Sequence, residues 1–442
     1  MKFPVIFLAG AACLVAGCSL QHDAADAFDA DVALTYCDRQ VHRALAQREG
    51  QADAESCGEA TPAATSPRNI PGTDTAWTCR PVCAEEWCSG FWPGILWYDY
   101  ACSGDPEVAA AAVASTQALQ TILEQPVFDH DLGFLLFCSA GTGYNVLTER
   151  LQRTDLTPAE RQADSLTADG FRRMLLRAAD SLATLFRPNV GTFLSWPRNV
   201  AMFGGHNTIM DNMINLELLY WAARKGGRPE LAEMATRHAE TTMQHHFRPD
   251  YTSYHVAVYD TLDGHFLRGV THQGLADSSM WARGQAWAVY GFTMVARETG
   301  DERFLLQAQR VADVFVERLP ADKVPFWDFC DPRIATSPDH PAAPSETVAP
   351  RDASAAAIVA SALLELSTLV KDEARSRHYF DVAKQMLSSL SSEFYQARQR
   401  NCAFLLHSTG NHPKQSEVDI PIVYADYYYI EALCRYRRLT GR

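Results

Sequence analysis

Most of the chain after residue 106 is a series of segments in which apolar residues recur three and four positions apart. This spacing places the apolar side chains on one face of a helix, so each segment is predicted to be an amphipathic α-helix. The predicted helices cover residues 107–124, 161–186, 209–224, 229–246, 279–298, 302–318, 353–371, 377–396 and 424–438, and another begins within residues 23–36. The pattern predicts an all-α fold.

Short turns join these helices. Thr299-Gly300-Asp301 combines a glycine that ends one helix with an aspartate that begins the next. Such connections make neighbouring helices antiparallel hairpins, which can form either an open α-solenoid or a closed α/α toroid. The periodicity does not distinguish these two. Alternating residues over 254–259, followed by a turn at 261–264, predict a small β-hairpin on the helical body.

The N-terminus has the features of an export signal. Met1 and Lys2 precede an apolar run that ends at Gly17 and is too short to span a bilayer. Small residues before Cys18 resemble the site at which bacterial lipoproteins are cleaved and acylated. Residues 1–17 are therefore predicted to be a signal peptide and Cys18 the lipidated N-terminus of a periplasmic or outer-membrane protein. The alternative is an ordinary cleaved signal with an incidental cysteine.

Composition limits the partners of the chain. Its net charge of −14 argues against nucleic acid or an anionic membrane face, because both require a basic surface. Membrane contact is expected only through the lipid anchor. A small anionic sugar stays possible, since a few local cations and backbone donors can hold it. Residues 49–75, rich in Ala, Gly, Ser, Thr and Pro, are predicted to be a surface loop or tether.

The cysteines favour disulfides over a metal site. Cys79, Cys83 and Cys88 lack the paired spacing of zinc ligands, and an exported protein is oxidised, so we expect pairing with Cys37, Cys57 or Cys102. The connectivity does not follow from the sequence. Cys138 and Cys434 lie in apolar helical segments and are predicted to be buried thiols.

Two motifs place polar or aromatic residues at predicted helix ends. Trp92 lies in Ser89-Gly90-Phe91-Trp92-Pro93-Gly94, where the glycines allow close approach and leave a ring free to stack on a sugar. Asp129, His130 and Asp131 precede a very apolar run. Asp129 suits a helix N-cap, whereas Asp131 would be desolvated without a task or a partner.

Two further motifs lie in predicted helices. Asp211 and Asn215 share one face of an apolar helix, where burial raises the pKa of a carboxyl, as a proton donor at neutral pH requires. A structural role for Asp211, bonded to a neighbouring helix, is the alternative. In residues 269–287, Arg283 and Trp287 are four apart and combine a carboxylate-binding fork with a sugar-stacking ring.

The same segment places other polar residues near a helix start. Asp277 or Ser278 is predicted to cap the helix, so that His272 and Gln273 precede it and reach into a cleft. Taken together, the motifs describe a carbohydrate site with two acids, stacking tryptophans and one cation.

The motif series resembles that of the unsaturated glucuronyl hydrolases, glycoside hydrolase family 88. The matching segments are SGFWPG, HDLGF, MDNMINLELLYWA, THQGLADSSMWARGQAW, PFWDF with RDASAAAI, and YADYYYIEAL, which occur in the family's order from about residue 87 to the C-terminus. The resemblance implies an (α/α)6 toroid with small β-hairpin insertions. It divides the chain into a tether with a first helix, 18–75, and a catalytic domain, 76–442.

The resemblance also implies roles for individual residues. Asp211 would be the general acid and base, and Asp131 the second essential carboxylate. The residues expected to bind substrate are Trp92, His130, Trp196, His255, Gln273, Trp281, Arg283 and Trp287. No metal or other cofactor is implied.

The implied reaction removes a 4,5-unsaturated glucuronic acid from lyase-generated glycosaminoglycan-type di- or oligosaccharides. Asp211 would protonate C4 of the vinyl ether and then activate a water that adds at C5, after which the hemiketal opens and releases the rest of the chain. The sequence departs from the family at Cys88 and at the insert 79–88, which leaves the preferred leaving sugar open.

Three other functions are compatible with part of these motifs. The related unsaturated rhamnogalacturonyl hydrolases cut pectin fragments, although the HDLGF and RGQAW segments disfavour them. A conventional inverting glycosidase would act on saturated aryl glycosides, and a non-catalytic glycan-binding lipoprotein would not need both acids. The loop 407–414 contains hydroxyls and one lysine that suit a sulfate, but a solvated loop is an equal alternative.

Overall fold

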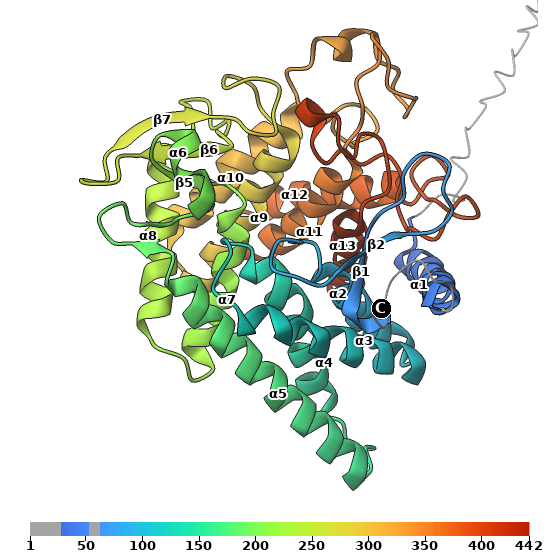
Figure 1. The fold of residues 1–442 in the computed structure, drawn as a ribbon. Coiled ribbons are helices and arrows are strands. Elements are labelled where there is room, and N and C mark those ends of the chain that lie inside the picture. Colours follow the sequence, from blue (N-terminus) through green and yellow to red (C-terminus); the bar gives the residue numbers. More distant parts are fainter. Residues whose placement is uncertain (1–27, 53–61, 442) are drawn as a thin grey trace, which may run out of the picture.

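The structure, a computed structural model, describes residues 28–52 and 62–441 (Figure 1). The predicted signal peptide and Cys18 lie outside these residues. Within the described part, no helix has both the length and the apolar character needed to cross a membrane.

Six helical elements form the inner ring of the molecule (Figure 1): α2 (Phe91–Ser103), the π-helix η4 (Gly133–Gly141) with α4 (Thr142–Arg150), α7 (Asn212–Arg224), α9 (Ala282–Thr299), α11 (Ala353–Leu369) and α13 (Val423–Thr440). Each packs against the next, and α13 closes the ring on α2. An inner helix is buried on all sides: every residue of α9 from Ala282 to Ala296 is buried. This closure confirms the predicted all-α toroid and excludes an open solenoid.

A second set of helices covers the ring: α1 (Ala30–Ala52), α3 (Pro106–Ala118), α5 (Pro158–Ala183), α8 (Glu230–His245), α10 (Glu302–Glu317) and α12 (Glu373–Leu390). These are buried on one face only. In α10 the buried residues include Phe304, Val311 and Phe315, and Asp301 caps the helix by accepting the Arg303 N–H at 2.8 Å. Gly300 ends α9 with a φ of +67°, so the predicted turn is confirmed.

The strands are short and antiparallel: β1 (Thr65–Asn69) pairs with β2 (Thr78–Pro81), β3 (Phe186–Arg187) with β4 (Thr192–Phe193), and β6 (Val256–Tyr259) lies between β5 (His206–Ile209) and β7 (Phe266–Val270). The β6–β7 hairpin was predicted, whereas β5 was not. Short helical turns complete the chain: η2 (Pro62–Ala64), η3 (Leu119–Glu124), η5 (Pro197–Asn199), α6 (Val200–Phe203), η6 (Pro332–Thr336) and η7 (His412–Lys414).

Three local predictions are wrong. α7 begins at Asn212 and not at 209, because β5 pairs with β6 and Met210 N–H donates to the His255 carbonyl at 3.0 Å. Neither Asp277 nor Ser278 caps α9, whose N-cap is Trp281; Asp277 instead accepts the Thr271 N–H at 2.8 Å.

The third correction concerns the segment 49–75. It was predicted to be a loop or tether, but α1 extends to residue 52 and β1 belongs to a paired hairpin. Cys138 is buried as predicted, whereas Cys434 is only half-buried. The Sγ atoms of Cys102 and Cys434 are 3.4 Å apart, so the structure places Cys434 beside Cys102.

Candidate active site

The Asp211 carboxyl lies at the start of α7. The residue is buried, and its Oδ2 atom has no hydrogen-bond partner in the part of the chain that the structure describes. Burial raises the pKa of Asp211 to about 6, against the opposing effects of the nearby Arg283 charge and the Trp287 indole N–H. A carboxyl with this pKa can both donate and accept a proton near neutral pH.

His255 faces Asp211 directly. Its Nδ1 atom accepts the N–H groups of His272 at 3.2 Å and Gln273 at 3.1 Å, which places the proton of the neutral ring on Nε2. Nε2 lies 3.6 Å from Asp211 Oδ2. Burial, and the neighbouring His272 and Arg283, hold the pKa of His255 well below its usual value, so the ring is a neutral donor directed at the acid.

Asp131 is the second buried acid. Burial and the charges of Asp129 and Asp211 raise the pKa of Asp131 well above its usual value. Its Oδ1 lies 3.2 Å from His130 Nε2, and His130 Nδ1–H donates to the Ser195 carbonyl at 3.1 Å. In the neutral His130 ring the proton is then on Nδ1, so Nε2 is an acceptor. A protonated Asp131 can donate to it.

Close packing of η4 on α7 brings the two acids together. A Cβ atom on Gly133 would lie 2.6 Å from the Asn215 Cα, so only glycine fits at this crossing. Asn215 accepts the Phe134 N–H at 3.0 Å and donates to the Asp211 carbonyl at 3.3 Å. The role of Asn215 is therefore to connect the two acid-bearing segments, which its shared helix face with Asp211 did not reveal.

Three tryptophans surround the acids. The half-buried Trp196 ring lies 6.2 Å from the His130 ring and 6.1 Å from the His255 ring, between the two acid–histidine pairs. The Trp281 ring is 4.5 Å from that of His255. Trp287 is fully buried, and its indole N–H is the group that acts on the Asp211 carboxyl.

Arg283 is held by the protein itself. Its guanidinium donates to Asp352 at 3.2 Å, to the Gly410 carbonyl at 2.6 Å and to the Thr409 carbonyl. Gln273 donates to the same Gly410 carbonyl at 3.2 Å. In the free protein both side chains therefore anchor the loop at 409–410, and binding of a substrate carboxylate by Arg283 stays a prediction.

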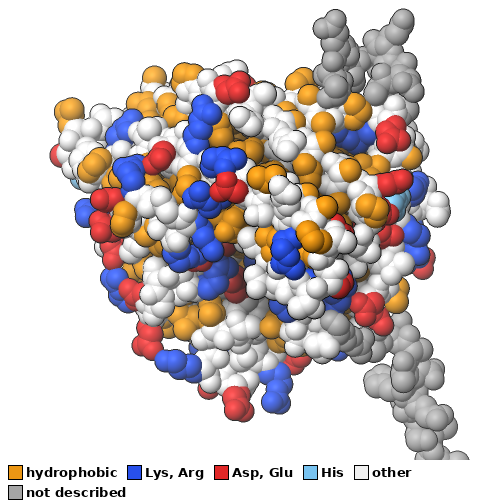
Figure 2. Space-filling view, turned by 90° about the horizontal axis from the view of Figure 1, so that it is seen from below, with side chains coloured by type: hydrophobic (Ala, Val, Ile, Leu, Met, Phe, Trp, Pro, Cys, Tyr) orange, Lys and Arg blue, Asp and Glu red, His pale blue; other side chains and the backbone are white. Residues whose placement is uncertain are grey.

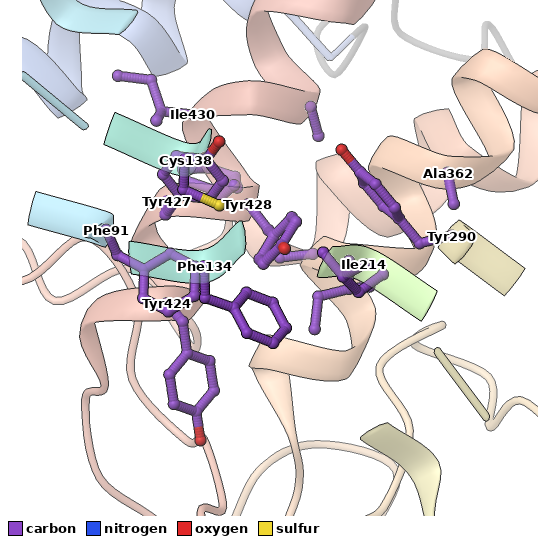
Figure 3. Close-up of a cluster of buried hydrophobic side chains, with 14 of the residues drawn as sticks. Phe91, Phe134, Cys138, Ile214, Tyr290, Ala362, Tyr424, Tyr427, Tyr428 and Ile430 are labelled. Atoms are coloured by element: carbon purple, nitrogen blue, oxygen red, sulfur yellow. The ribbon is translucent and has the colours of Figure 1, made fainter. Parts of the chain in front are cut away.

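The structure buries Trp92, which the sequence singled out, and leaves Trp87, which it did not, half-buried. Trp92 packs beneath Arg48 of α1, with 5.5 Å from the guanidinium carbon to the ring centroid. The half-buried Trp87 instead lies 5.4 Å from Phe134 and 5.1 Å from Tyr424. In Figure 3 the Tyr424 hydroxyl points away from the other labelled side chains, and this buried oxygen has no hydrogen-bond partner.

Basic and imidazole groups surround this centre. Arg198, about half-exposed, pairs with Asp129 at 3.2 Å. Lys414, on the loop considered for sulfate, has its Nζ 3.4 Å from His272 Nε2. Ser408 Oγ of that loop is buried without a partner, whereas Thr409 Oγ1 donates to the Arg351 carbonyl at 2.9 Å.

Asp129, His130 and Asp131 each offer one ligand atom within 4.8 Å of the others, which is a donor set suited to a divalent cation. Asp129 is already engaged by Arg198 and by the Asp131 N–H at 3.2 Å. The expectation that no metal takes part stays a prediction.

Unpartnered buried atoms meet at this place. Asp211 Oδ2 and His255 Nε2 face each other at 3.6 Å, and neither has a hydrogen-bond partner among the described residues. A buried polar atom without a partner costs free energy and is rare in native proteins. Their convergence around two acids with raised pKa values indicates a site kept ready for a polar ligand.

Comparison with known proteins agrees with this geometry. No family model matches the sequence. An unsaturated glucuronyl hydrolase of Formosa agariphila is 39% identical over 362 residues, covering 81% of this chain and 82% of the relative. An unsaturated glucuronyl hydrolase of Bacillus sp. strain GL1 is 32% identical over 361 residues, covering 80% of this chain and 88% of the relative.

Solved structures give the same result. An unsaturated glucuronyl hydrolase specific for heparin superposes with a TM-score of 0.75 at 38% identity, covering 92% of this chain and 98% of the other. The Bacillus enzyme superposes with a TM-score of 0.76 at 28% identity, covering 93% and 97%. The chain belongs to the unsaturated glucuronyl hydrolases.

Proposed function

We propose that this protein hydrolyses the terminal 4,5-unsaturated glucuronic acid of lyase-generated glycosaminoglycan-type oligosaccharides, with Asp211 as general acid and base. The observation that carries the proposal is the buried, unpartnered Asp211 oxygen, with a pKa of about 6, beside Asp131. Relatives that act on unsaturated glucuronyl and chondroitin substrates support the substrate class.

The first chemical step is protonation of C4. Protonated Asp211 gives its proton to the C4 carbon of the vinyl ether, and positive charge develops at C5 and the ring oxygen. The Asp211 carboxylate that results then removes a proton from a water that adds at C5. The hemiketal opens as its hydroxyl proton passes to the ring oxygen, which gives a ketone at C5 and a hemiacetal at C1. This hemiacetal then releases the remaining sugar as a free alcohol and leaves an aldehyde.

Asp131 and the histidines prepare this step. A protonated Asp131 donates to His130 Nε2 and leaves only one of the two acids free to change charge. The neutral His255 stabilises the Asp211 carboxylate once its proton has gone, since its Nε2–H faces that oxygen. The rings of Trp196 and Trp87 are half-buried and lie beside the site, so part of each ring is open to contact with a sugar.

Loss of the ultraviolet absorbance of the C4=C5 double bond tests the proposal. Purified protein is mixed with unsaturated disaccharides from heparin and chondroitin lyases, with Asp211→Asn in parallel. We expect decay with the wild type alone. Decay on pectin-derived fragments only, or activity on saturated aryl glucuronides, would instead support one of the alternative hydrolases.

We also propose that the protein is exported and lipid-anchored through Cys18. The proposal is supported by the apolar N-terminal run and the small residues before that cysteine. Metabolic labelling with a fatty acid tests it: label should appear in the wild type and not in Cys18→Ala. Label in neither, with export retained, would support an ordinary cleaved signal.

A further inference from the structure

We propose that Arg68, on strand β1, is a positioning residue for the sugar-binding site. Its guanidinium holds both the Trp87 ring and the segment 407–420, which we call the rim loop, in the places that substrate binding requires. This inference rests on the proposed function and concerns a residue in the part of the chain that the sequence assigned to a tether.

The Arg68 guanidinium donates hydrogen bonds to two carboxylates and lies over an aromatic ring. Its Nε and Nη2 atoms donate to the two oxygens of Glu417, both at 2.7 Å, and Nη1 donates to Glu86 at 2.6 Å. The guanidinium carbon lies 5.6 Å from the centroid of the Trp87 ring. This two-pronged contact with Glu417 fixes direction as well as distance, which a lysine does not reproduce.

Glu417 in turn fixes the shape of the rim loop. Gln415, Glu417 and Asp419 all have φ values between 50° and 58°, a left-handed conformation that non-glycine residues keep only with outside support. The Glu417 carbonyl accepts the Gly410 N–H at 2.6 Å, and a Cβ atom on Gly410 would lie 2.6 Å from Glu417 Oε2. Asn69 also donates to Glu417, at 2.7 Å.

Gly410 connects the rim loop to the acid. Its carbonyl accepts from Arg283 at 2.6 Å and from Gln273 at 3.2 Å. Arg283 lowers the pKa of Asp211, and the Gln273 N–H holds the His255 ring that faces Asp211. A displaced rim loop would therefore move the groups that line the acid.

Arg68 also makes a cation–π contact with the Trp87 ring. This ring packs at 5.1 Å from Tyr424 and 5.4 Å from Phe134, and Arg283 lies 5.3 Å from the Tyr424 ring. A cation over the ring adds attraction that keeps it in one orientation. Loss of Arg68 would thus loosen an aromatic wall and the rim loop together.

A purely structural role is the alternative. Burying a charge pair can join the N-terminal hairpin to the toroid without influencing substrate, in which case removing Arg68 lowers stability alone. Arg80 provides the matched control, because it lies on the paired strand β2 and contacts the same Glu86 at 3.4 Å, yet its side chain is 54% exposed.

The experiment compares Arg68→Met and Arg68→Lys with Arg80→Met in the full chain. Steady-state kinetics on an unsaturated disaccharide give kcat and KM, and hydrogen exchange follows the amides of residues 408–420 in the free protein. We expect Arg68→Met to raise KM by about 10-fold or more with a smaller loss of kcat, and Arg68→Lys to recover part of it. Arg80→Met should leave both unchanged.

Exchange should be faster in the rim loop of Arg68→Met, because the Ser408 and Ile420 amides bond each other's carbonyls across it, at 3.1 and 3.0 Å. A KM within about 2-fold of wild type, with unchanged exchange, would overturn the proposal even if melting fell. Should Arg68→Met not fold, Glu417→Gln and Arg68→Lys give the same test. A wild type without activity would refute the proposed function, while the exchange data would still decide whether Arg68 positions the loop.

Discussion

The site around Asp211 and the charged network around Glu431 lie at opposite ends of the toroid, and they differ in how many of their buried polar atoms have hydrogen-bond partners. At one end lie the beginnings of the inner helices, with Asp211 at α7, Trp281 at α9 and Tyr424 at α13, and several buried polar atoms there lack partners. At the other end lie the last turns of α9, α11 and α13, which line a cavity of about 780 Å³ with charged side chains.

The Glu431 carboxylate at this second end has several hydrogen-bond partners. Glu431 accepts from Tyr98 at 3.1 Å, Tyr290 at 3.0 Å, Ser361 at 2.6 Å and Arg435 at 3.3 Å. Arg435 also pairs with Glu365 at 3.1 Å. The face seen from below in Figure 2 likewise shows Lys and Arg side chains next to Asp and Glu.

The difference indicates that the Asp211 end serves substrate binding and that the Glu431 network serves stability. Around Asp211, partners are withheld where a substrate would supply them, at a cost in folding free energy, whereas Glu431 and Arg435 satisfy each other and their neighbours. Helix N-termini add a favourable field for an anionic sugar at the first end, because their N–H groups carry partial positive charge. Changes at the two ends should consequently separate activity from stability.

The largest effect is expected from Asp211→Asn. Removing the proton donor should lower kcat by about 1,000-fold or more, because both proton transfers depend on it. Stability should not fall, since ionising a carboxyl whose pKa is raised to about 6 opposes folding at neutral pH. Double-bond decay and thermal melting measure the two effects. Asp301→Asn, at the exposed cap of α10, is the control and should change neither, as asparagine caps equally well.

Arg435→Met should produce the opposite result. It leaves Glu431 and Glu365 short of a partner in a buried network, so we expect a loss of about 3–5 kcal/mol in unfolding free energy. At a temperature where the variant is folded, kcat should match wild type. Denaturant unfolding and kinetics test this, with the exposed Arg438→Met as control. A variant of normal stability that lost activity would contradict the division between the two ends.

The pH dependence of kcat/KM and of stability tests the role of the Asp211 end. Asp211 must be protonated to act on C4, so kcat/KM should be retained below its pKa of about 6 and fall about 10-fold per unit as pH rises above it. The stability contribution has the same direction: the folded carboxyl binds its proton more tightly than the unfolded one, so ionisation destabilises the fold between the two pKa values. A pH–rate profile in which the alkaline limb begins above pH 8 would assign the proton to another group.

The helices of the toroid were predictable because their signal is local. Burial of one face or of the whole helix leaves a periodic pattern that needs no knowledge of the partner, and the acid at the start of an apolar helix stood out for the same reason. The start of α7 was misplaced because it depends on β5 pairing with β6, a contact between residues 206–209 and 256–259. A short strand that is defined by a distant partner gives no such pattern.

The arrangement of the site was less predictable. Trp92 and Trp87 are five positions apart, and only the presence of Arg48 from α1 over Trp92 shows which ring is covered. Arg68 and Glu417 are separated by 349 positions, and a composition rich in small residues hid the strand that carries Arg68. Side chains that act across the ring closure are specified by the fold and not by neighbouring residues.

The smallest expected effect lies at the second end, where α2 and α13 close the ring. Cys102 and Cys434 have their Sγ atoms 3.4 Å apart and both line the cavity, so we expect oxidised glutathione to react with them. Two thiols would form one disulfide, passing two protons and two electrons to the oxidant, which becomes two glutathione thiols. A cross-link that spans 332 positions restricts the unfolded chain, and we expect melting to rise by a few degrees. Activity should stay constant, because the bond lies away from the acids.

Intact mass and melting of Cys434→Ser under the same treatment provide the control. An equal rise in the melting temperature of that variant would show that the cross-link is elsewhere. A loss of activity in the oxidised wild type would show that the two ends are coupled.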